Sequence, residues 1–248
     1  MNVLAGGGAP QAPAPGTSQS SGPGPAALHG LRRTARAGGL RPALAELART
    51  LLPGLLPCGP SGHAVVAGDP VDPAPLLWVG GRIAPRHPAR ETVIRVCDLP
   101  GGPVTLLDTA AAVSPAEGET GAAGCDRTTF TLALLWVRLG LAERLRSQCL
   151  EYLGNRRSGD TVLLQQQLVK GTLADVLAEH LEIGAVLEDT SPESVSPALL
   201  YQLHTQLTMA ERQQVRLLGA GGFLSGGPGE TAYLSELLAE VHAVPGEE

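Results

Sequence analysis

The second half of the chain contains four segments in which apolar residues recur at helical spacing. They extend over about residues 126–153, 161–187, 197–218 and 230–242. One stripe of the second segment holds Val169, Leu173, Val176, Leu177, His180, Ile183, Gly184 and Leu187. Because short connections make consecutive helices neighbours in space, residues 125–245 predict an antiparallel four-helix bundle.

A different pattern occupies residues 62–115. The runs "HAVVAG", "PLLWVGGRIAP", "ETVIRVCDL" and "PVTLLDT" are short, apolar and rich in β-branched residues, and Pro, Gly and Asp separate them. This pattern indicates a small, mainly antiparallel β-domain. The stretch "SPAEGETGAAG" that follows has the composition of a flexible linker before the helical part. The fold class is therefore predicted to be α+β.

The N-terminal part is simpler. Residues 39–57 predict a single short helix, because Leu44, Leu47 and Leu51 follow helical spacing and Pro53 ends the pattern. Residues 1–38 consist mostly of Gly, Ala, Pro and Ser, with a small basic cluster "LRRTARA". Such a composition buries too little apolar surface to offset the entropy of ordering, so we expect a disordered tail.

Charge and cysteine usage exclude several classes of protein. The formal net charge is −6, which argues against binding of nucleic acid, because such binding requires a basic face. The four cysteines are scattered without zinc-ligand spacing. No signal peptide is recognisable at the N-terminus, and no apolar run approaches the roughly 20 residues of a membrane span. We therefore expect a cytoplasmic protein that does not contact a membrane.

A glycine-rich stretch, "LLGAGGFLSGGPG", connects the last two helical segments. Glycine amides beside a helix can bind phosphate, but they can also simply turn the chain. The dinucleotide-binding motif G-x-G-x-x-G fails because Leu224 stands where its third glycine is required. P-loop, G-x-S-x-G and H-E-x-x-H motifs are absent from the sequence.

Two stretches resemble the C-terminal helical domain of the acyl-CoA dehydrogenase family. The first is "RLGLAERLRSQCLEYLGNRRSGDTVLLQQQLVKGTLADVLAEH", in which Arg157 falls on the family's arginine and Gln167 on its glutamine. Gly159 and Asp160 replace the family's Phe-Gly. In the second stretch the family has Gln-x-x-Gly-Gly-x-Gly-Tyr/Phe, and this chain has residues 216–223; Tyr233 then falls on a tyrosine of the next helix.

The resemblance implies a flavoprotein fold with a helical, a β- and a second helical domain. In the family, the arginine and the glycine loop cross a subunit interface and hold FAD on the neighbouring subunit. The chemistry is reasonable, because arginine binds phosphate through two hydrogen bonds and glycine permits close approach. The residues that match these cofactor contacts are Arg157, Gln167, Gly219, Gly221, Gly222 and Phe223. The alternative is that these glycines only end one helix and turn the chain.

The chain also departs from the family pattern. The family's catalytic glutamate falls on Ala243 or, in other members, on Phe130. A shifted register would bring in Glu240 or Asp126, but a base one helical turn away is a poor substitute. Only one short helix precedes the β-region, and that region is short for the family's middle domain. The resemblance therefore describes a truncated and degenerate member with no catalytic residue of its own.

Three functions follow from these observations. The first is a catalytically incomplete subunit that forms a homo- or hetero-oligomer and contributes FAD contacts to a fuller acyl-CoA dehydrogenase-like partner acting on an acyl thioester. The second is an active FAD-dependent dehydrogenase of acyl-CoA, or of an acyl carrier, with a displaced base. The third is a non-enzymatic helical interaction module.

Overall fold

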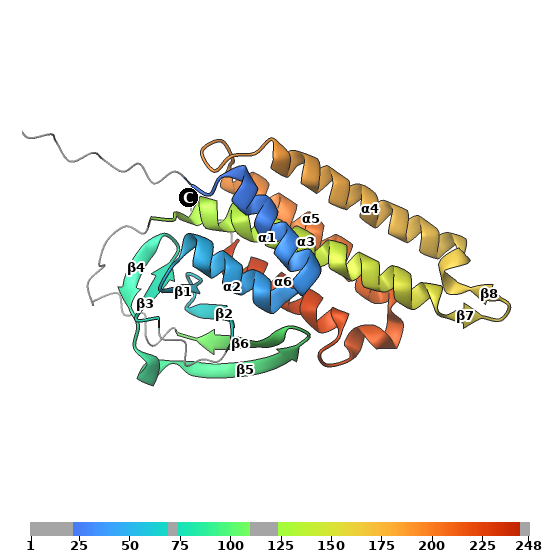
Figure 1. The fold of residues 1–248 in the computed structure, drawn as a ribbon, viewed down its shortest axis with the longest axis horizontal. Coiled ribbons are helices and arrows are strands. Elements are labelled where there is room, and N and C mark those ends of the chain that lie inside the picture. Colours follow the sequence, from blue (N-terminus) through green and yellow to red (C-terminus); the bar gives the residue numbers. More distant parts are fainter. Residues whose placement is uncertain (1–21, 69–73, 110–123, 244–248) are drawn as a thin grey trace, which may run out of the picture.

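The computed structural model describes residues 22–68, 74–109 and 124–243 (Figure 1). Its α-helices are α1 (Pro25–Gly38), α2 (Leu40–Leu51), α3 (Arg127–Gly154), α4 (Gln167–Glu188), α5 (Pro197–Leu217) and α6 (Pro228–His242). Its strands are β1 (Leu55–Cys58), β2 (His63–Ala67), β3 (Leu76–Val79), β4 (Arg82–Pro85), β5 (Thr92–Leu99), β6 (Gly102–Asp108), β7 (Arg157–Ser158) and β8 (Thr161–Val162). The predicted α+β class is confirmed.

Helix α3 is the central element of the molecule. Its first turn is capped by the Asp126 side chain, which accepts a hydrogen bond of 2.7 Å from the Thr129 amide. From Thr129 to Glu143 every residue is buried, as expected for a helix that other elements surround. Helices α1, α4, α5 and α6 all contact α3, and consecutive helices from α3 to α6 run in opposite directions (Figure 1).

The strands form two small sheets beside α2 and a separate hairpin at the end of α3. In the first sheet, β3 lies between β1 and β4, pairing parallel with β1 and antiparallel with β4. In the second sheet, β6 lies between β2 and β5, and both pairings are antiparallel. The sheets are thus mainly antiparallel, as predicted, and α2 and α6 pack against β2. The hairpin consists of β7 and β8.

The prediction of a disordered tail over residues 1–38 is wrong for residues 25–38, which form α1. Leu28, Leu31 and Ala35 recur on one face of α1 and are fully or nearly fully buried against α3. Arg32 adds an ion pair to the buried Glu143, with 2.5 Å between Nη2 and Oε1. The prediction failed because the composition was averaged over 38 residues, whereas the amphipathic segment is only 14 residues long. The prediction for residues 1–21 lies outside the described residues.

Two predicted boundaries also require correction. The single helix expected over residues 39–57 ends at Leu51, and Leu55–Cys58 form strand β1, in which Leu56 and Cys58 are buried. The helix expected from residue 161 begins at Gln167, because residues 157–162 form the β7–β8 hairpin and Gln166 has an extended backbone. The other three helices of the C-terminal part match their predicted ranges within two residues.

Among residues 22–68, 74–109 and 124–243, no helix has the length and apolarity needed to cross a lipid bilayer. The linker predicted over residues 114–124 lies almost entirely outside the described part of the chain. The proposed division into domains stays a prediction.

Candidate functional site

The glycine-rich stretch forms a compact turn between α5 and α6. Residues Gly219–Phe223 make one turn of 3-10 helix, and α6 begins at Pro228 after an extended Gly227. Gly219 has a φ of 55°, a backbone conformation that favours glycine. A Cβ atom on Gly229 would overlap the carbonyl oxygen of Gly222, so the turn lies directly on the first turn of α6.

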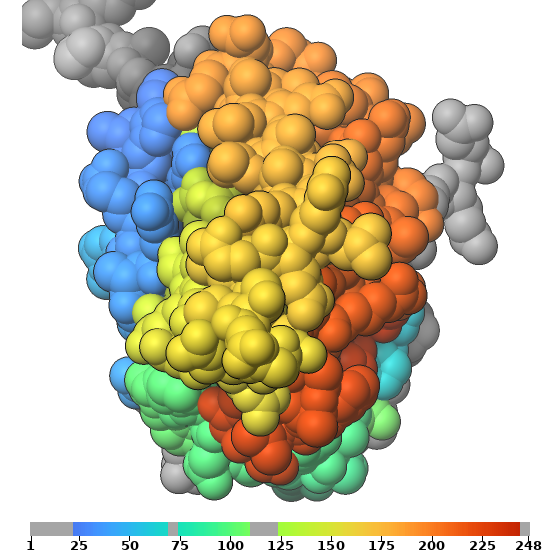
Figure 2. Space-filling model, turned by 90° about the vertical axis from the view of Figure 1, so that its right-hand side faces the viewer, coloured from blue at the N-terminus to red at the C-terminus, as the bar shows by residue number. Residues whose placement is uncertain are grey.

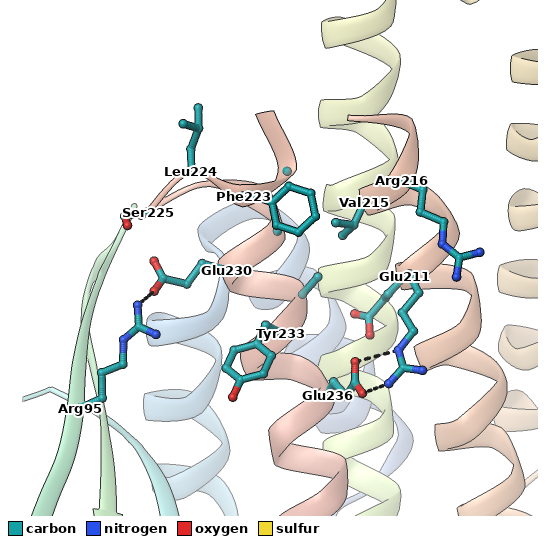
Figure 3. Close-up of a pocket in the computed structure, with 14 residues that line it drawn as sticks. Arg95, Glu211, Val215, Arg216, Phe223, Leu224, Ser225, Glu230, Tyr233 and Glu236 are labelled. Carbon is teal, nitrogen blue, oxygen red and sulfur yellow. Dashed lines mark hydrogen bonds and ion pairs between the residues drawn. The ribbon is translucent and has the colours of Figure 1, made fainter. Parts of the chain in front are cut away.

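A cavity of about 600 Å³ lies beside this turn (Figure 3). Its walls come from β5, from the C-terminal half of α5, from the turn and from the start of α6. They comprise Arg95, Glu211, Arg212, Val215, Arg216, Gly222, Phe223, Leu224, Ser225, Gly229, Glu230, Ala232, Tyr233 and Glu236. Of the predicted cofactor contacts, Gly222 and Phe223 therefore line the cavity, whereas Gly219 and Gly221 belong to the same turn without lining it.

Most charges in the cavity wall are paired. Arg95 on β5 approaches Glu230 on α6 to 2.6 Å, and the other oxygen of Glu230 accepts a hydrogen bond from the Gly226 amide at 2.7 Å. Arg212 forms an ion pair with Glu236, drawn in Figure 3. Arg216 is exposed and has no carboxylate within ion-pair distance among the described residues. It is therefore the cation in this wall that remains available to a ligand.

Glu211 closes the deep side of the cavity. It is fully buried, and burial raises the pKa of its carboxyl group, opposed by the neighbouring Arg138. One oxygen accepts a hydrogen bond from Arg138 at 2.9 Å and the other accepts one from the Ser235 hydroxyl at 2.9 Å. Because both oxygens are hydrogen-bonded inside the protein, this carboxylate stabilises the packing of α3, α5 and α6 and is not available to a ligand.

Large apolar side chains at the mouth of the cavity are exposed. Phe223 is 85% exposed, Leu224 64% and Tyr233 52%. Figure 3 shows the Phe223 ring near Val215 of α5, and Tyr233 on α6. Because exposed aromatic residues next to arginine are typical of binding surfaces, this rim is suited to contact a ligand or another protein.

Arg157 and Gln167 do not line the cavity. Arg157 lies in the β7–β8 hairpin, which projects from the end of α3 (Figures 1 and 2). It is exposed, and its Nη2 donates a hydrogen bond of 3.1 Å to the Asp160 carbonyl oxygen. Gln167 is the first residue of α4 and is exposed.

Tyr152, near the end of α3, contacts the glycine turn and Arg156, the residue before β7. A Cβ atom on Gly221 would lie 3.1 Å from the Tyr152 hydroxyl, so the turn rests on this ring. The Arg156 guanidinium lies 4.7 Å from the centre of the same ring and donates a hydrogen bond to its hydroxyl. A hydrophobic cluster that includes Leu153, Leu173 and Leu218 holds the same end of the molecule together. The two stretches that resemble the acyl-CoA dehydrogenase family, one around Arg157 and one at the glycine turn, therefore lie at the same end of the helices.

Sequence reasoning missed Tyr152, Arg156 and Arg216 as members of this site. The spacing of Tyr152 and Arg156, four residues apart near the end of a helix, is a signal for a stacked pair. Their contact with a turn that lies about 70 residues further along the chain has no comparable local signal.

Neither of the two positions predicted to carry the family's base, Ala243 and Phe130, has a titratable side chain. Ala243 and Phe130 are both buried, and the Phe130 ring lies 4.9 Å from the His242 ring. Asp126 is occupied as the cap of α3, and Glu240 is exposed on α6. In the described part of the chain, no group of three or more His, Cys, Asp or Glu residues is placed to hold a metal ion.

Neither a protein-family model nor any curated protein matches the sequence. Several solved structures of acyl-CoA dehydrogenases are similar in fold. They include butyryl-CoA dehydrogenase from Megasphaera elsdenii, at 13% identity and a TM-score of 0.47, over 84% of this chain and 62% of that one. An acyl-CoA dehydrogenase from Slackia heliotrinireducens is similar at 12% identity and a TM-score of 0.49, over 77% of this chain and 62% of that one. A glutaryl-CoA dehydrogenase from Mycobacterium smegmatis, in complex with FADH2, is similar at 18% identity and a TM-score of 0.47, over 76% of this chain and 58% of that one. The chain spans about three fifths of the length of these proteins.

Proposed function

We propose that this chain is an acyl-CoA dehydrogenase-like subunit that lacks a catalytic base of its own. It lends the Gly219–Phe223 turn, Arg157 and Gln167 to FAD bound by a fuller acyl-CoA dehydrogenase-like partner, and the complex acts on an acyl thioester. The same proposal places the subunit in the cytoplasm.

The arrangement of arginines at one end of the molecule carries this proposal. Arg156, Arg157 and Arg216 are exposed, and none has a carboxylate partner among the described residues. Tyr152 and the adjoining glycine turn connect the elements from which they come. A pyrophosphate is a ligand that suits such a set, since arginine binds phosphate oxygens through charge-assisted hydrogen bonds and glycine allows the backbone to approach.

Flavin is the group that would supply redox chemistry in such a complex. The residues of this chain fit its phosphate-bearing part, because the exposed arginines are cationic and the exposed Phe223 offers an apolar face beside them. The buried Phe130 and Ala243 offer no group that accepts a proton, which supports a contribution to cofactor binding without a contribution to proton transfer.

Substitution of the arginines tests the proposal in the complex isolated from the cells that make it. Changing Arg157 or Arg216 to Gln removes the charge and keeps most of the side-chain length. The loss of a charge-assisted hydrogen bond should speed flavin release about tenfold or more. Arg49→Gln is the matched control, because Arg49 is exposed on α2 and pairs locally with Glu46. Equal release rates for all these variants and the native complex would reject the proposed contacts.

A further inference from the structure

A second cavity lies between α2, β1, β2, the start of α3 and the C-terminal end of α6. Its volume is about 190 Å³. Its walls are made by Leu44, Ala45, Leu47, Ala48, Leu55, Leu56, Pro57, Val65, Val66, Ala67, Phe130, Leu238 and His242. His242 is the one residue among them with a polar side chain, so the wall is otherwise hydrocarbon.

The residues of the cavity wall differ in exposure. Phe130, Leu238 and His242 are each no more than 3% exposed. On α2 and β1, Ala45 is exposed, and Ala48 and Pro57 are half-buried. The wall therefore combines a buried part that includes His242 with residues that reach the surface.

His242 has an unused capacity for hydrogen bonding. Its Nε2 atom is buried and has no hydrogen-bond partner among the described residues. Burial, with a smaller contribution from Arg127, lowers the pKa of this imidazole to about 3, so the ring is neutral at physiological pH. Its neighbours are aromatic, with ring centres at 4.9 Å for Phe130 and 6.2 Å for Trp78. His242 lines this cavity and also a smaller one, of about 90 Å³, beside Arg127 and Thr131. Buried polar atoms in native proteins are nearly always paired, so its unpaired Nε2 atom points to a missing partner in one of the two cavities.

We propose that this cavity binds a small uncharged molecule that consists of an alkyl chain with one terminal hydroxyl group. An apolar cavity of about 150 Å³ is known to hold a six-carbon ring, so a chain of about six carbons fits the volume here. The hydroxyl pairs with the neutral imidazole of His242, and the chain lies against the leucines and valines of α2, β1 and β2. This inference does not depend on the proposed flavin contacts.

A homologous series of alcohols tests the size of the site. The full chain is titrated with 1-butanol to 1-octanol, and binding is followed by tryptophan fluorescence, to which Trp78 contributes from its place against Phe130 and His242. Each added methylene should raise affinity about fourfold until the cavity is full. Affinity should stop rising near hexanol. No saturable binding, or a rise that continues through octanol, would overturn the proposal.

Two variants test the location and the polar contact. Ala48→Leu fills the cavity from α2 and should abolish hexanol binding, while Ala178→Leu, on the exposed face of α4, should leave it unchanged. If Ala48→Leu does not fold, Ala45→Leu, at the exposed edge of the cavity wall, serves the same purpose. Native protein should bind 1-hexanol at least tenfold more tightly than 1-chlorohexane, and His242→Phe should remove that preference. Equal binding of both probes by native protein would overturn the hydroxyl contact.

Discussion

The glycine turn depends on two single residues, Gly229 and Gly222, because their backbones lie in close contact. The backbone of the turn lies so close to α6 that a methyl group on Gly229 would overlap the Gly222 carbonyl oxygen. We therefore expect Gly229→Ala to lower the free energy of unfolding by about 1–3 kcal/mol through overpacking. Gly171→Ala, at an exposed position of α4 with no atom within 4 Å of the new methyl group, should instead raise it by about 0.5–1 kcal/mol. Urea unfolding of both variants measures the contrast, and equal effects would contradict it.

The buried histidines predict a pH dependence of stability. Burial, helped by the nearby Arg146, lowers the pKa of His180 to about 4, and burial lowers that of His242 to about 3. In the unfolded chain both pKa values are about 6.5. Below that pH the unfolded state therefore binds more protons than the folded state does. The free energy of unfolding should then fall as the pH drops from about 7 to about 4, by up to about 1.4 kcal/mol per pH unit for each histidine. His242→Phe should reduce this slope by one histidine's share; an unchanged slope would show that His242 does not cause it.

Among the elements, α3, α5 and α6 are joined by a buried polar network around Arg138. This side chain is fully buried and donates hydrogen bonds to Glu211 at 2.9 Å, to Ser235 at 3.0 Å and to Thr208 at 2.8 Å. It also lies 2.9 Å from the Nδ1 atom of His204, whose Nε2 lies 3.2 Å from the Thr131 carbonyl oxygen. The network therefore fixes how the three helices pack against one another.

Removing one partner of this network should be costly. Arg138→Met leaves Glu211 buried without its cation and should lower the free energy of unfolding by about 3–5 kcal/mol. Arg212→Ala breaks an ion pair between the same helices α5 and α6 but at the surface, and should cost at most about 1 kcal/mol. Adding Glu211→Leu to Arg138→Met should recover much of the loss. Similar costs for the buried and exposed substitutions would refute the assignment.

The accuracy of sequence-based prediction differed among the elements for physical reasons. The helices α3, α5 and α6 were predictable because apolar periodicity is a local property of their sequences, and Pro228 marks the start of α6. Helix α1 was not predicted, because its three buried residues are buried only by packing against α3, which lies about 100 residues further along the chain. In the site, the glycine turn was recognisable from its composition, but the contact between Tyr152 and Gly221 depends on how whole helices pack.

In the molecule as a whole, the glycine turn and Ala243, one of the two positions predicted to carry the family's base, lie at opposite ends of α6. The turn precedes Pro228, whereas Ala243 follows His242. A helix of this length separates its ends by about 20 Å. On the function proposed above, contacts of the arginines with a neighbouring subunit would therefore not depend on a base at the other end of α6.

The measurement that tests this account most directly is the visible absorption spectrum of the chain, purified alone and then with the subunits that accompany it in the cell. We predict that the isolated chain is colourless and that the complex shows a flavin band which weakens when Arg157 and Arg216 are both changed to Gln. An isolated chain that retains near-stoichiometric flavin and oxidises an acyl-CoA would contradict the account and establish an active dehydrogenase with a displaced base. A complex that contains no flavin would contradict it in the other direction and leave a helical interaction module.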